Sequence, residues 1–271
     1  MSTQQEKAET FLGRHFGTTP LLLPNPWDRG SAVLLASLGF EALATTSSGS
    51  AATLGRLDGA LGRDEAFEQA AAIVDATDLP VSADLENGFA DDPAGVAETI
   101  ALARDAGLAG GSVEDYSRQA DPPIYNLGLA TERVAAAAEA AHAGTRVVLT
   151  ARAENHVRGR PDLADTITRL QRYQEAGADV LFAPGVVDEA DLRRLIACVD
   201  RPINVLAVPG CPPVAALAAL GVRRISVGGG FAFAAYGAAV EAATEFRDAG
   251  TYGYRDRARV GSAAARAAFG T

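Results

Sequence analysis

The sequence predicts a (β/α)₈ TIM barrel, and two observations support that prediction. Eight short β-rich runs alternate with longer, Ala-rich amphipathic stretches along the 271 residues. At roughly 30 residues per unit, eight such units account for the length of one barrel domain. No Pro-, Gly- or Ser-rich linker divides the chain, so we expect a single domain over residues 1–271. An open doubly wound sheet is the alternative fold, and the count of eight favours the closed barrel.

The predicted strands are short runs rich in Val, Ile and Leu, and the predicted helices are the longer stretches between them. The strands cover residues 21–24, 41–46, 79–84, 110–115, 146–151, 178–183, 202–207 and 223–228. The helices cover residues 31–38, 64–77, 93–107, 131–144, 162–177, 189–199, 212–221 and 231–249. Several helices end in a glycine just before the next strand, as helix C-caps favour: Gly39, Gly107, Gly144, Gly177 and Gly221.

The two ends of the chain stand outside the eight units. Residues 1–18 form a polar N-terminal lead. Residues 250–271 follow the last predicted helix, with helical spacing but few apolar residues that could form a core of their own. We therefore expect this C-terminal segment to pack on a neighbouring subunit and to serve in oligomerisation.

Composition excludes several functional classes. A net charge of −10 and a pI near 4.8 argue against nucleic acid or an anionic membrane as partner. The N-terminus lacks the apolar region of a signal peptide, and no apolar run is long enough to span a bilayer. Cysteine is limited to Cys198 and Cys211, without metal or disulfide spacing, which indicates a cytoplasmic protein. Lys7, in the polar lead, is the one lysine, so Schiff-base aldolase and pyridoxal chemistry are excluded.

Charged residues gather where the third, fourth and fifth predicted strands end. They are Asp84, Glu86, Glu114, Asp115, Arg152 and Glu154. Active sites of barrels lie at these carboxyl ends. Because side chains alternate along a strand, Asp84 and Glu86 share one face. An unpaired buried Asp84 would be costly, and a hard cation that takes one or two carboxylates and keeps several waters removes that cost. We therefore predict a Mg²⁺ or Mn²⁺ site with Asp84 as direct ligand and with Glu86 and Glu114 acting directly or through water.

The alternative interpretation is that these acids form ion pairs with Arg152 and with other arginines at the barrel mouth. Asp115 is interpreted as a surface or loop-anchoring acid. Asp58, in TLGRLDG, has the spacing of an ordinary Asp-Gly turn. Of the three histidines, His156 is the one near the predicted site, and we interpret it as a structural loop residue.

Two loops have the composition of anion-binding loops. TTSSGSAATLG, residues 45–55, follows the second strand and is rich in hydroxyl groups and backbone donors that could cradle a carboxylate or phosphate. Gly228, Gly229 and Gly230 follow the eighth strand, where barrels often bind phosphate. Tight packing between strand and helix is the interpretation we favour for these three glycines.

In this order, the motifs resemble those of the isocitrate lyase/phosphoenolpyruvate mutase superfamily over nearly the whole chain. Residues 25–59 resemble the family's opening, in which a strand, a helix and a Ser/Gly substrate loop lead to an Asp. PVSADLENGF, residues 80–89, resembles its metal-binding D-x-D/E-x-G-[YF] segment. GGSVED (110–115) and TARAEN (150–155) resemble the strands that carry a metal-proximal Glu and an Arg with a Glu.

The resemblance implies a Mg²⁺ held by Asp84, with Asp58, Glu86 and Glu114 around it, mostly through water. Asp58, which spacing alone assigns to a turn, thereby becomes a predicted site residue. Members of the family are typically homotetramers whose eighth helix swaps between neighbouring barrels. We therefore expect a homotetramer or homodimer with a swapped C-terminal helix.

The resemblance also implies how a small carboxylic acid substrate binds. Thr46, Ser47 and Ser48 would hold one carboxylate through hydroxyl and backbone N–H groups. Arg152 would neutralise the other anionic end of the substrate or a developing enolate. Arg152 and Glu114 are the two predicted catalytic residues. The family's carbon–carbon lyases carry a K-[KR]-C-G-H loop after the fourth strand, and this chain has SRQADPPIYN at residues 117–126 instead, which argues against isocitrate or methylisocitrate cleavage.

The predicted function is therefore that of a Mg²⁺-dependent lyase. It would cleave or decarboxylate a small 2-oxo or 2-hydroxy carboxylic acid through an enolate-like species. Phosphorus–carbon bond chemistry on a phosphonopyruvate-like acid is the first alternative. A non-catalytic barrel that binds a carboxylate ligand is the second.

Overall fold

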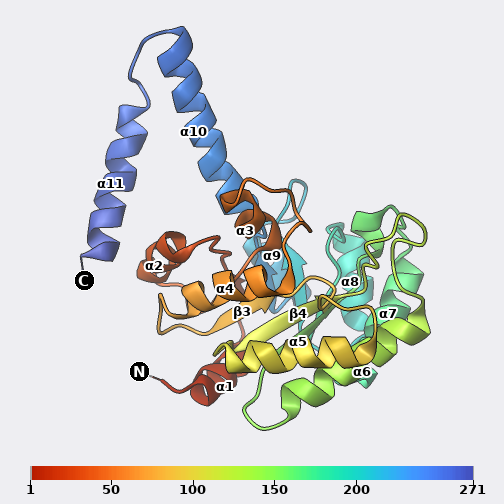
Figure 1. Cartoon of the computed structure of the whole chain (residues 1–271). Helices are drawn as coiled ribbons and strands as arrows, with labels where there is room; N and C mark the ends of the chain where they lie inside the picture. The colour runs from red at the N-terminus through yellow and green to blue at the C-terminus, as the bar shows by residue number, and fades with distance from the viewer. Residues whose placement is uncertain (1, 271) are drawn as a thin grey trace.

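A computed structural model describes residues 2–270 and shows eight parallel strands in a nearly closed barrel (Figure 1). The strands are β1 (Leu21–Leu23), β2 (Leu43–Ala44), β3 (Val81–Asp84), β4 (Gly110–Glu114), β5 (Val148–Arg152), β6 (Val180–Phe182), β7 (Ile203–Leu206) and β8 (Arg224–Ser226). Each strand pairs with its neighbours in the order β1-β8-β7-β6-β5-β4-β3-β2. At the remaining seam, the Ala44 N–H donates to the Pro24 carbonyl over 3.1 Å. The barrel prediction is confirmed, and the open doubly wound sheet is wrong.

Helices surround the strands, and each predicted strand and helix segment overlaps an observed element. The helices are α1 (Gln4–Arg14), α2 (Arg29–Ser37), α3 (Ser47–Thr53), α4 (Arg63–Val74), α5 (Pro93–Asp105), α6 (Leu127–His142), the 3₁₀ turn η1 (Asn155–Arg158), α7 (Leu163–Glu175), α8 (Glu189–Ala197), α9 (Val214–Leu220), α10 (Gly230–Asp248) and α11 (Arg255–Phe269). One expectation needs correction, because much of the predicted Ser/Thr/Gly loop forms α3. Thr46 caps this helix, since its hydroxyl accepts a hydrogen bond from the Gly49 N–H at 3.4 Å.

The N-terminal lead, expected only as a polar segment, forms α1 and closes one end of the barrel. Its buried Ala8 and Phe11 pack on residues at the starts of the strands, including Leu21 and Val148. A side chain at Gly110 would prevent this approach, because a Cβ there would lie 2.7 Å from the Phe11 ring. The apolar plug leaves only the carboxyl ends of the strands open, and these ends form the site described below.

His15 follows α1 and lies fully buried beneath the barrel. Its Nδ1 is 2.8 Å from the Phe11 carbonyl, and its Nε2 is 3.4 Å from Nη1 of Arg224. A guanidinium can only donate, so Nε2 accepts and the ring is neutral with its proton on Nδ1. Burial, with the nearby charge of Arg224, lowers the pKa of His15 from 6.5 to about 3.

This lowered pKa predicts acid sensitivity. Below pH 6.5 the unfolded chain takes up a proton on His15 that the folded chain refuses until about pH 3, so stability falls as the pH falls through that window. We expect the free energy of unfolding to drop by about 2 kcal/mol more in wild type than in His15→Gln between pH 6.5 and roughly pH 4.5. The glutamine can still accept from Arg224 but does not titrate. Urea unfolding of both proteins across this range measures the difference, and parallel pH profiles would contradict the assignment.

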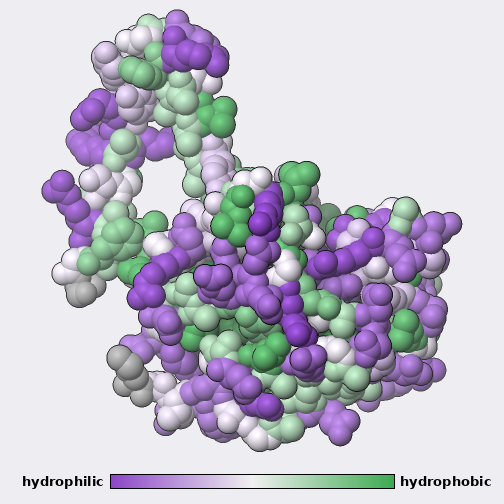
Figure 2. Space-filling view, viewed as in Figure 1, coloured by the Kyte–Doolittle hydropathy of each residue, from purple (hydrophilic) through white to green (hydrophobic). Residues whose placement is uncertain are grey.

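The last two helices form an arm, residues 230–269, that projects from the barrel (Figure 1). α10 leaves the carboxyl end of β8, and α11 runs back to pack on α2. The arm exposes large apolar side chains, among them Val240 at 65%, Phe246 at 58% and Val260 at 69%. Figure 2 shows hydrophobic residues on the surface of the arm. Across residues 2–270, no helix combines the length and hydropathy that crossing a membrane requires.

Candidate active site

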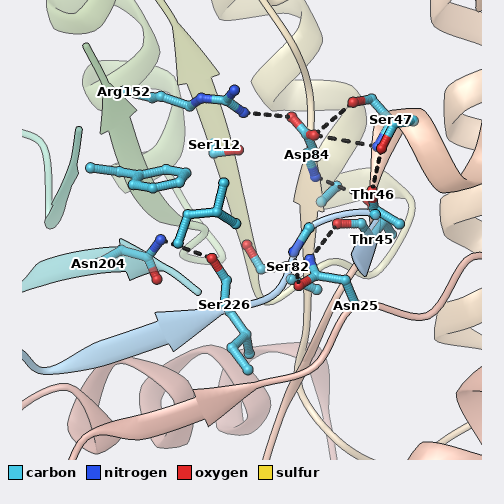
Figure 3. A pocket seen from close by; sticks show the side chains of 18 of the residues that line it. Asn25, Thr45, Thr46, Ser47, Ser82, Asp84, Ser112, Arg152, Asn204 and Ser226 are labelled. Atoms are coloured by element: carbon cyan, nitrogen blue, oxygen red, sulfur yellow. Dashed lines mark hydrogen bonds and ion pairs between the residues drawn. The ribbon is translucent and has the colours of Figure 1, made fainter. Parts of the chain in front are cut away.

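Two adjoining cavities lie at the carboxyl ends of the strands. The first, which we call the barrel cavity, has a volume of about 200 Å³ and reaches down between the strands (Figure 3). The second, the mouth cavity, has a volume of about 300 Å³ and shares Ser47, Asp58 and Arg152 with the first. The predicted site residues divide between them. Thr46, Ser47, Ser48, Asp58, Asp84 and Arg152 line the barrel cavity, and Glu86 and Glu114 line the mouth cavity.

Asp84 ends β3 and points into the barrel cavity (Figure 3). Its Oδ2 accepts from the hydroxyl of Ser47 at 2.9 Å and from the Ser47 N–H at 3.3 Å. Its Oδ1 accepts from the Glu86 N–H at 3.2 Å and lies 3.9 Å from Nη1 of Arg152. Neutral donors therefore hold most of this carboxylate. Ser47, predicted as a substrate ligand, uses both its hydroxyl and its N–H to hold Asp84.

Arg152 ends β5 and lies at the centre of an ion-pair network. Its Nη1 is 3.2 Å from Glu114, and its Nε donates to the fully buried Glu154. The guanidinium also stacks over the Phe182 ring, 5.2 Å from the ring centroid. Although burial opposes its charge, the carboxylates of Glu114, Glu154 and Asp84 raise the pKa of Arg152 above its ordinary value. Arg152 therefore remains a cation at the wall shared by both cavities.

Glu86 and Glu114 both pair with arginines, as the alternative interpretation expected. Arg118 donates to Glu86, and Arg158 lies 3.8 Å from Glu114 in addition to the contact from Arg152. Burial raises the pKa of Glu86 to about 7, although Arg118 opposes this shift. Burial also raises the pKa of Glu114 well above its ordinary value, against the influence of Arg152. The arginines thus compensate the two carboxylates only in part.

The charge balance of the mouth suits a divalent cation. The carboxylates of Asp58, Asp84, Glu86, Glu114 and Glu154 face the guanidinium groups of Arg118, Arg152 and Arg158, which leaves an excess of two negative charges when all are ionised. Within residues 2–270, no three His, Cys, Asp or Glu side chains converge closely enough to ligate a metal together. Mg²⁺ needs no such cluster, because it takes one or two carboxylates and keeps several waters, so the acids of the mouth fit it as oxygen ligands.

Asp115 is an anchoring residue beneath this network. Asp115 is buried, so its interpretation as a surface acid is wrong. Its carboxylate accepts from the Tyr173 hydroxyl at 2.6 Å and from Arg169 at 2.9 Å. Its other oxygen accepts from the Glu154 N–H at 2.8 Å. Asp115 thereby fixes the backbone directly after β5. This contact holds the segment that presents Arg152 and Glu154.

Sequence reasoning missed several residues that line the cavities. Arg118 and Arg158 come from the loops after β4 and β5, and Arg158 pairs with Glu154 four residues before it. A search for basic residues at this spacing could have found Arg158. Asn204 lies in β7, Arg224 begins β8, and both line the barrel cavity. For Asn204 the signal was a polar residue within an otherwise apolar strand.

Two other interpretations are consistent with the structure. His156 lies in η1 and lines neither cavity. Gly229 lies against α3, where a Cβ would come within 2.6 Å of the Ser48 hydroxyl. The N–H of Gly228 donates to the Asn25 side chain at 2.9 Å. Close packing thus accounts for Gly229, whereas a Cβ at Gly230 would meet no atom within 4 Å.

Comparison with known proteins places these features in context. The sequence profile of the family described as phosphoenolpyruvate phosphomutase matches residues 11–247. An uncharacterized protein of Mycobacterium tuberculosis is 33% identical over 81% of this chain and 81% of its own length. The oxaloacetate decarboxylase of Chromohalobacter salexigens is 34% identical over 82% of this chain and 79% of its own. A crystal structure from Burkholderia cenocepacia J2315, described as a candidate lyase/mutase, is 50% identical, covers 93% of this chain and 92% of that one, and superposes with a TM-score of 0.91.

Proposed function

Since the chain belongs to the phosphoenolpyruvate phosphomutase family, within the isocitrate lyase/phosphoenolpyruvate mutase superfamily, we propose that it is a Mg²⁺-dependent carbon–carbon lyase. Its substrate would be a small 2-oxo or 2-hydroxy carboxylic acid. The observation that supports this most is the placement of Asp84 and Arg152 on one cavity lined by hydroxyl groups. The similarity to an oxaloacetate decarboxylase points in the same direction.

The residues of the site would share the work as follows. Asp84 would hold the metal directly, with Asp58, Glu86 and Glu114 reaching it through water. A bound Mg²⁺ supplies a Lewis acid that polarises the 2-oxo group of the substrate. Ser47 orients Asp84 through the two hydrogen bonds described above.

The substrate would be bound by neutral donors at one end and by a cation at the other. Thr46 and Ser48, whose hydroxyls lie 3.2 Å apart on the barrel cavity, would hold the carboxylate beside the 2-oxo group. Arg152 would stabilise the negative charge that develops on the enolate oxygen. Its planar guanidinium suits this task because it stays charged and is already oriented by Glu114 and Glu154.

Decarboxylation is the reaction that this set of side chains supports best. In the described chain, the side chains lining the two cavities include no histidine, lysine or cysteine. Cleavage of a 2-hydroxy acid begins with loss of the hydroxyl proton and needs a general base. The carboxylates of the mouth cavity that could serve, Glu86 and Glu114, are held by Arg118, Arg152 and Arg158. A 3-carboxy-2-oxo acid needs none, because its C3–C4 bond breaks, CO₂ leaves, and the electron pair remains as an enolate that takes one proton at C3 from solvent water.

Phosphorus–carbon chemistry is the second candidate, and one observation favours it. Arg118, Arg152 and Arg158 all line the mouth cavity, and three guanidinium groups could bind a phosphonate. Product analysis separates the two functions. Pyruvate and CO₂ from oxaloacetate support the lyase, whereas phosphate or phosphoenolpyruvate from phosphonopyruvate supports the alternative.

Titration calorimetry with oxalate, an enolate mimic, tests the proposal. We expect oxalate to bind in the presence of Mg²⁺ at least about tenfold more tightly than after metal removal with a chelator, since a tenfold change corresponds to about 1.4 kcal/mol. Oxalate binding that ignores Mg²⁺, or no binding at all, would favour a non-catalytic barrel.

The arm formed by residues 230–269 is proposed as the oligomerisation segment. Its exposed Phe233, Val240 and Phe246 would be covered by a second copy of the chain in a homodimer or homotetramer. We expect Val240→Asp to lower the mass measured by analytical ultracentrifugation at micromolar concentration, because the aspartate would be desolvated in the interface. The matched control is Val214→Asp, on the similarly exposed start of α9. Equal masses for wild type and V240D would contradict the assignment.

A further inference from the structure

Arg224 is a buried cation with neutral partners. It begins β8 and is 4% exposed. Its Nε donates to Asn204 at 2.9 Å, its Nη2 to the Thr150 hydroxyl at 3.0 Å, and its Nη1 lies 3.4 Å from His15. These contacts use three of the five N–H donors of a guanidinium and leave one on each Nη atom.

No carboxylate of residues 2–270 forms an ion pair with Arg224. Two other arginines of the barrel differ, since Arg169 pairs with Asp115 and Asp165, and Arg152 pairs with Glu114 and Glu154. The buried Arg133 also forms no ion pair within residues 2–270, but it donates to the carbonyls of Asn87, Ala90 and Asp91 and lines neither cavity. Burial without a counter-charge lowers the pKa of Arg224 to about 9, whereas carboxylates raise the pKa of Arg152. A buried and uncompensated charge is costly, so its retention calls for a reason.

Arg224 lines the barrel cavity together with four neutral polar side chains. We call Ser82, Ser112, Asn204, Arg224 and Ser226 the cavity floor. The four neutral members come from β3, β4, β7 and β8, and the Asn204 amide donates to the Ser226 hydroxyl at 3.0 Å (Figure 3). Serine hydroxyls can rotate to donate, so the floor can present several donors to one anion. It offers no anionic group of its own.

The floor lies one step below the residues proposed to bind the metal and the substrate. Ser82 and Ser112 precede Asp84 and Glu114 by two residues on the same strand faces. Two residues along a strand correspond to about 6.6 Å. A short carbon chain bound at Asp84 can therefore extend toward Arg224.

We propose that the cavity floor is a subsite for the second acidic group of the substrate. A distal carboxylate would accept from the two remaining Nη–H donors of Arg224 and from the serine hydroxyls, while the other end of the molecule lies near Asp84 and Arg152. This proposal rests on the proposed function, since it assumes a carboxylic acid bound at the metal. The substrate would then be a dicarboxylic acid. Its second carboxylate would be bound by Arg224, inside the barrel, and not by the arginines of the mouth.

L-malate and L-lactate provide the test, because they share the 2-hydroxy acid end and differ in the distal carboxylate. Titration calorimetry with Mg²⁺ present should show that the wild type binds malate at least about tenfold more tightly than lactate, the value of one good charged contact. Arg224→Gln should bring the two affinities within about twofold of each other. Oxalate, which has no distal carboxylate, should bind both proteins equally.

Asn204→Asp gives a second variant in which misfolding cannot explain the result. The new carboxylate would lie beside the Nε of Arg224 and supply the missing counter-charge within the protein. We expect an unchanged or higher melting temperature together with loss of the preference for malate. Asn126→Asp, which adds the same charge at the exposed N-cap of α6, is the matched control and should keep the preference.

The outcomes separate the two proposals. If oxalate fails to bind the wild type with Mg²⁺, the proposed function fails. If oxalate binds and Arg224→Gln or Asn204→Asp retains the wild-type preference for malate, the subsite is refuted. A third outcome is that both variants keep the preference for malate, while chloride stabilises the folded wild type and does not stabilise Arg224→Gln. That outcome would assign the floor to an inorganic anion and would also overturn the substrate subsite.

Discussion

Replacing Asp84 by asparagine is expected to lower kcat/KM for the decarboxylated substrate by about 10³-fold or more. The amide keeps the shape of the carboxylate and can still accept from Ser47, but it removes a site carboxylate whose oxygens are held mainly by neutral donors. A loss of about 4 kcal/mol in transition-state stabilisation corresponds to that factor. Steady-state kinetics with purified protein measures it.

The Asp84→Asn protein should remain folded, because Asp84 is not paired closely with any guanidinium. Circular dichroism and thermal unfolding check this point, and calorimetry should show that Mg²⁺-dependent oxalate binding is gone. Asp105→Asn is the matched control, since Asp105 is an exposed acid at the end of α5. Turnover retained in Asp84→Asn would refute the metal role of Asp84.

Replacing Arg152 by glutamine is expected to damage both activity and stability. Activity should fall about 10²- to 10³-fold, because the developing negative charge would lose its cation. Stability should fall by about 3–5 kcal/mol, since removal of the guanidinium leaves Glu114 and Glu154 buried with weaker compensation. Urea unfolding and steady-state kinetics measure the two effects separately.

A double variant distinguishes the two roles of Arg152. Arg152→Gln combined with Glu154→Gln removes the cation together with the most deeply buried of its acidic partners. We expect the double variant to recover about half or more of the lost unfolding free energy, as coupled neighbours do, and to recover no activity. Recovery of activity along with stability would show that Arg152 acts only by holding the fold together.

The pattern of the sequence was sufficient for the barrel. Each predicted strand segment overlaps one of the eight strands, and Gly39 and Gly177 end helices with positive φ as expected. These features depend on local alternation of apolar residues and on local backbone geometry, both of which can be read along a single segment. The helix over Ser47–Thr53 was missed because Ser, Gly and Thr favour loops locally. The surrounding packing overrides that preference, with Gly49 close to Trp27 and Ala232.

The site was predicted in part. Residues at the ends of strands, such as Asp84, Glu114 and Arg152, were found because the barrel brings those ends together. Arg118 was not named because loop residues carry no periodic signal, and Arg158 was not named because its spacing of four residues from Glu154 was not used. The burial of His15 and Asp115 could not be predicted either, since it depends on α1 closing the barrel and on Tyr173 and Arg169 reaching across from α7.

The order of residues along the chain determined by itself that acids and an arginine would meet at one end of a barrel. Parallel strands all point the same way, so residues that follow them necessarily gather at one rim. Only the tertiary structure decided the partner of each charge: Ser47 for Asp84, Arg118 for Glu86, and neutral groups for Arg224. Such contacts join residues far apart in the chain, and they depend on strand register and side-chain packing, which no local pattern encodes.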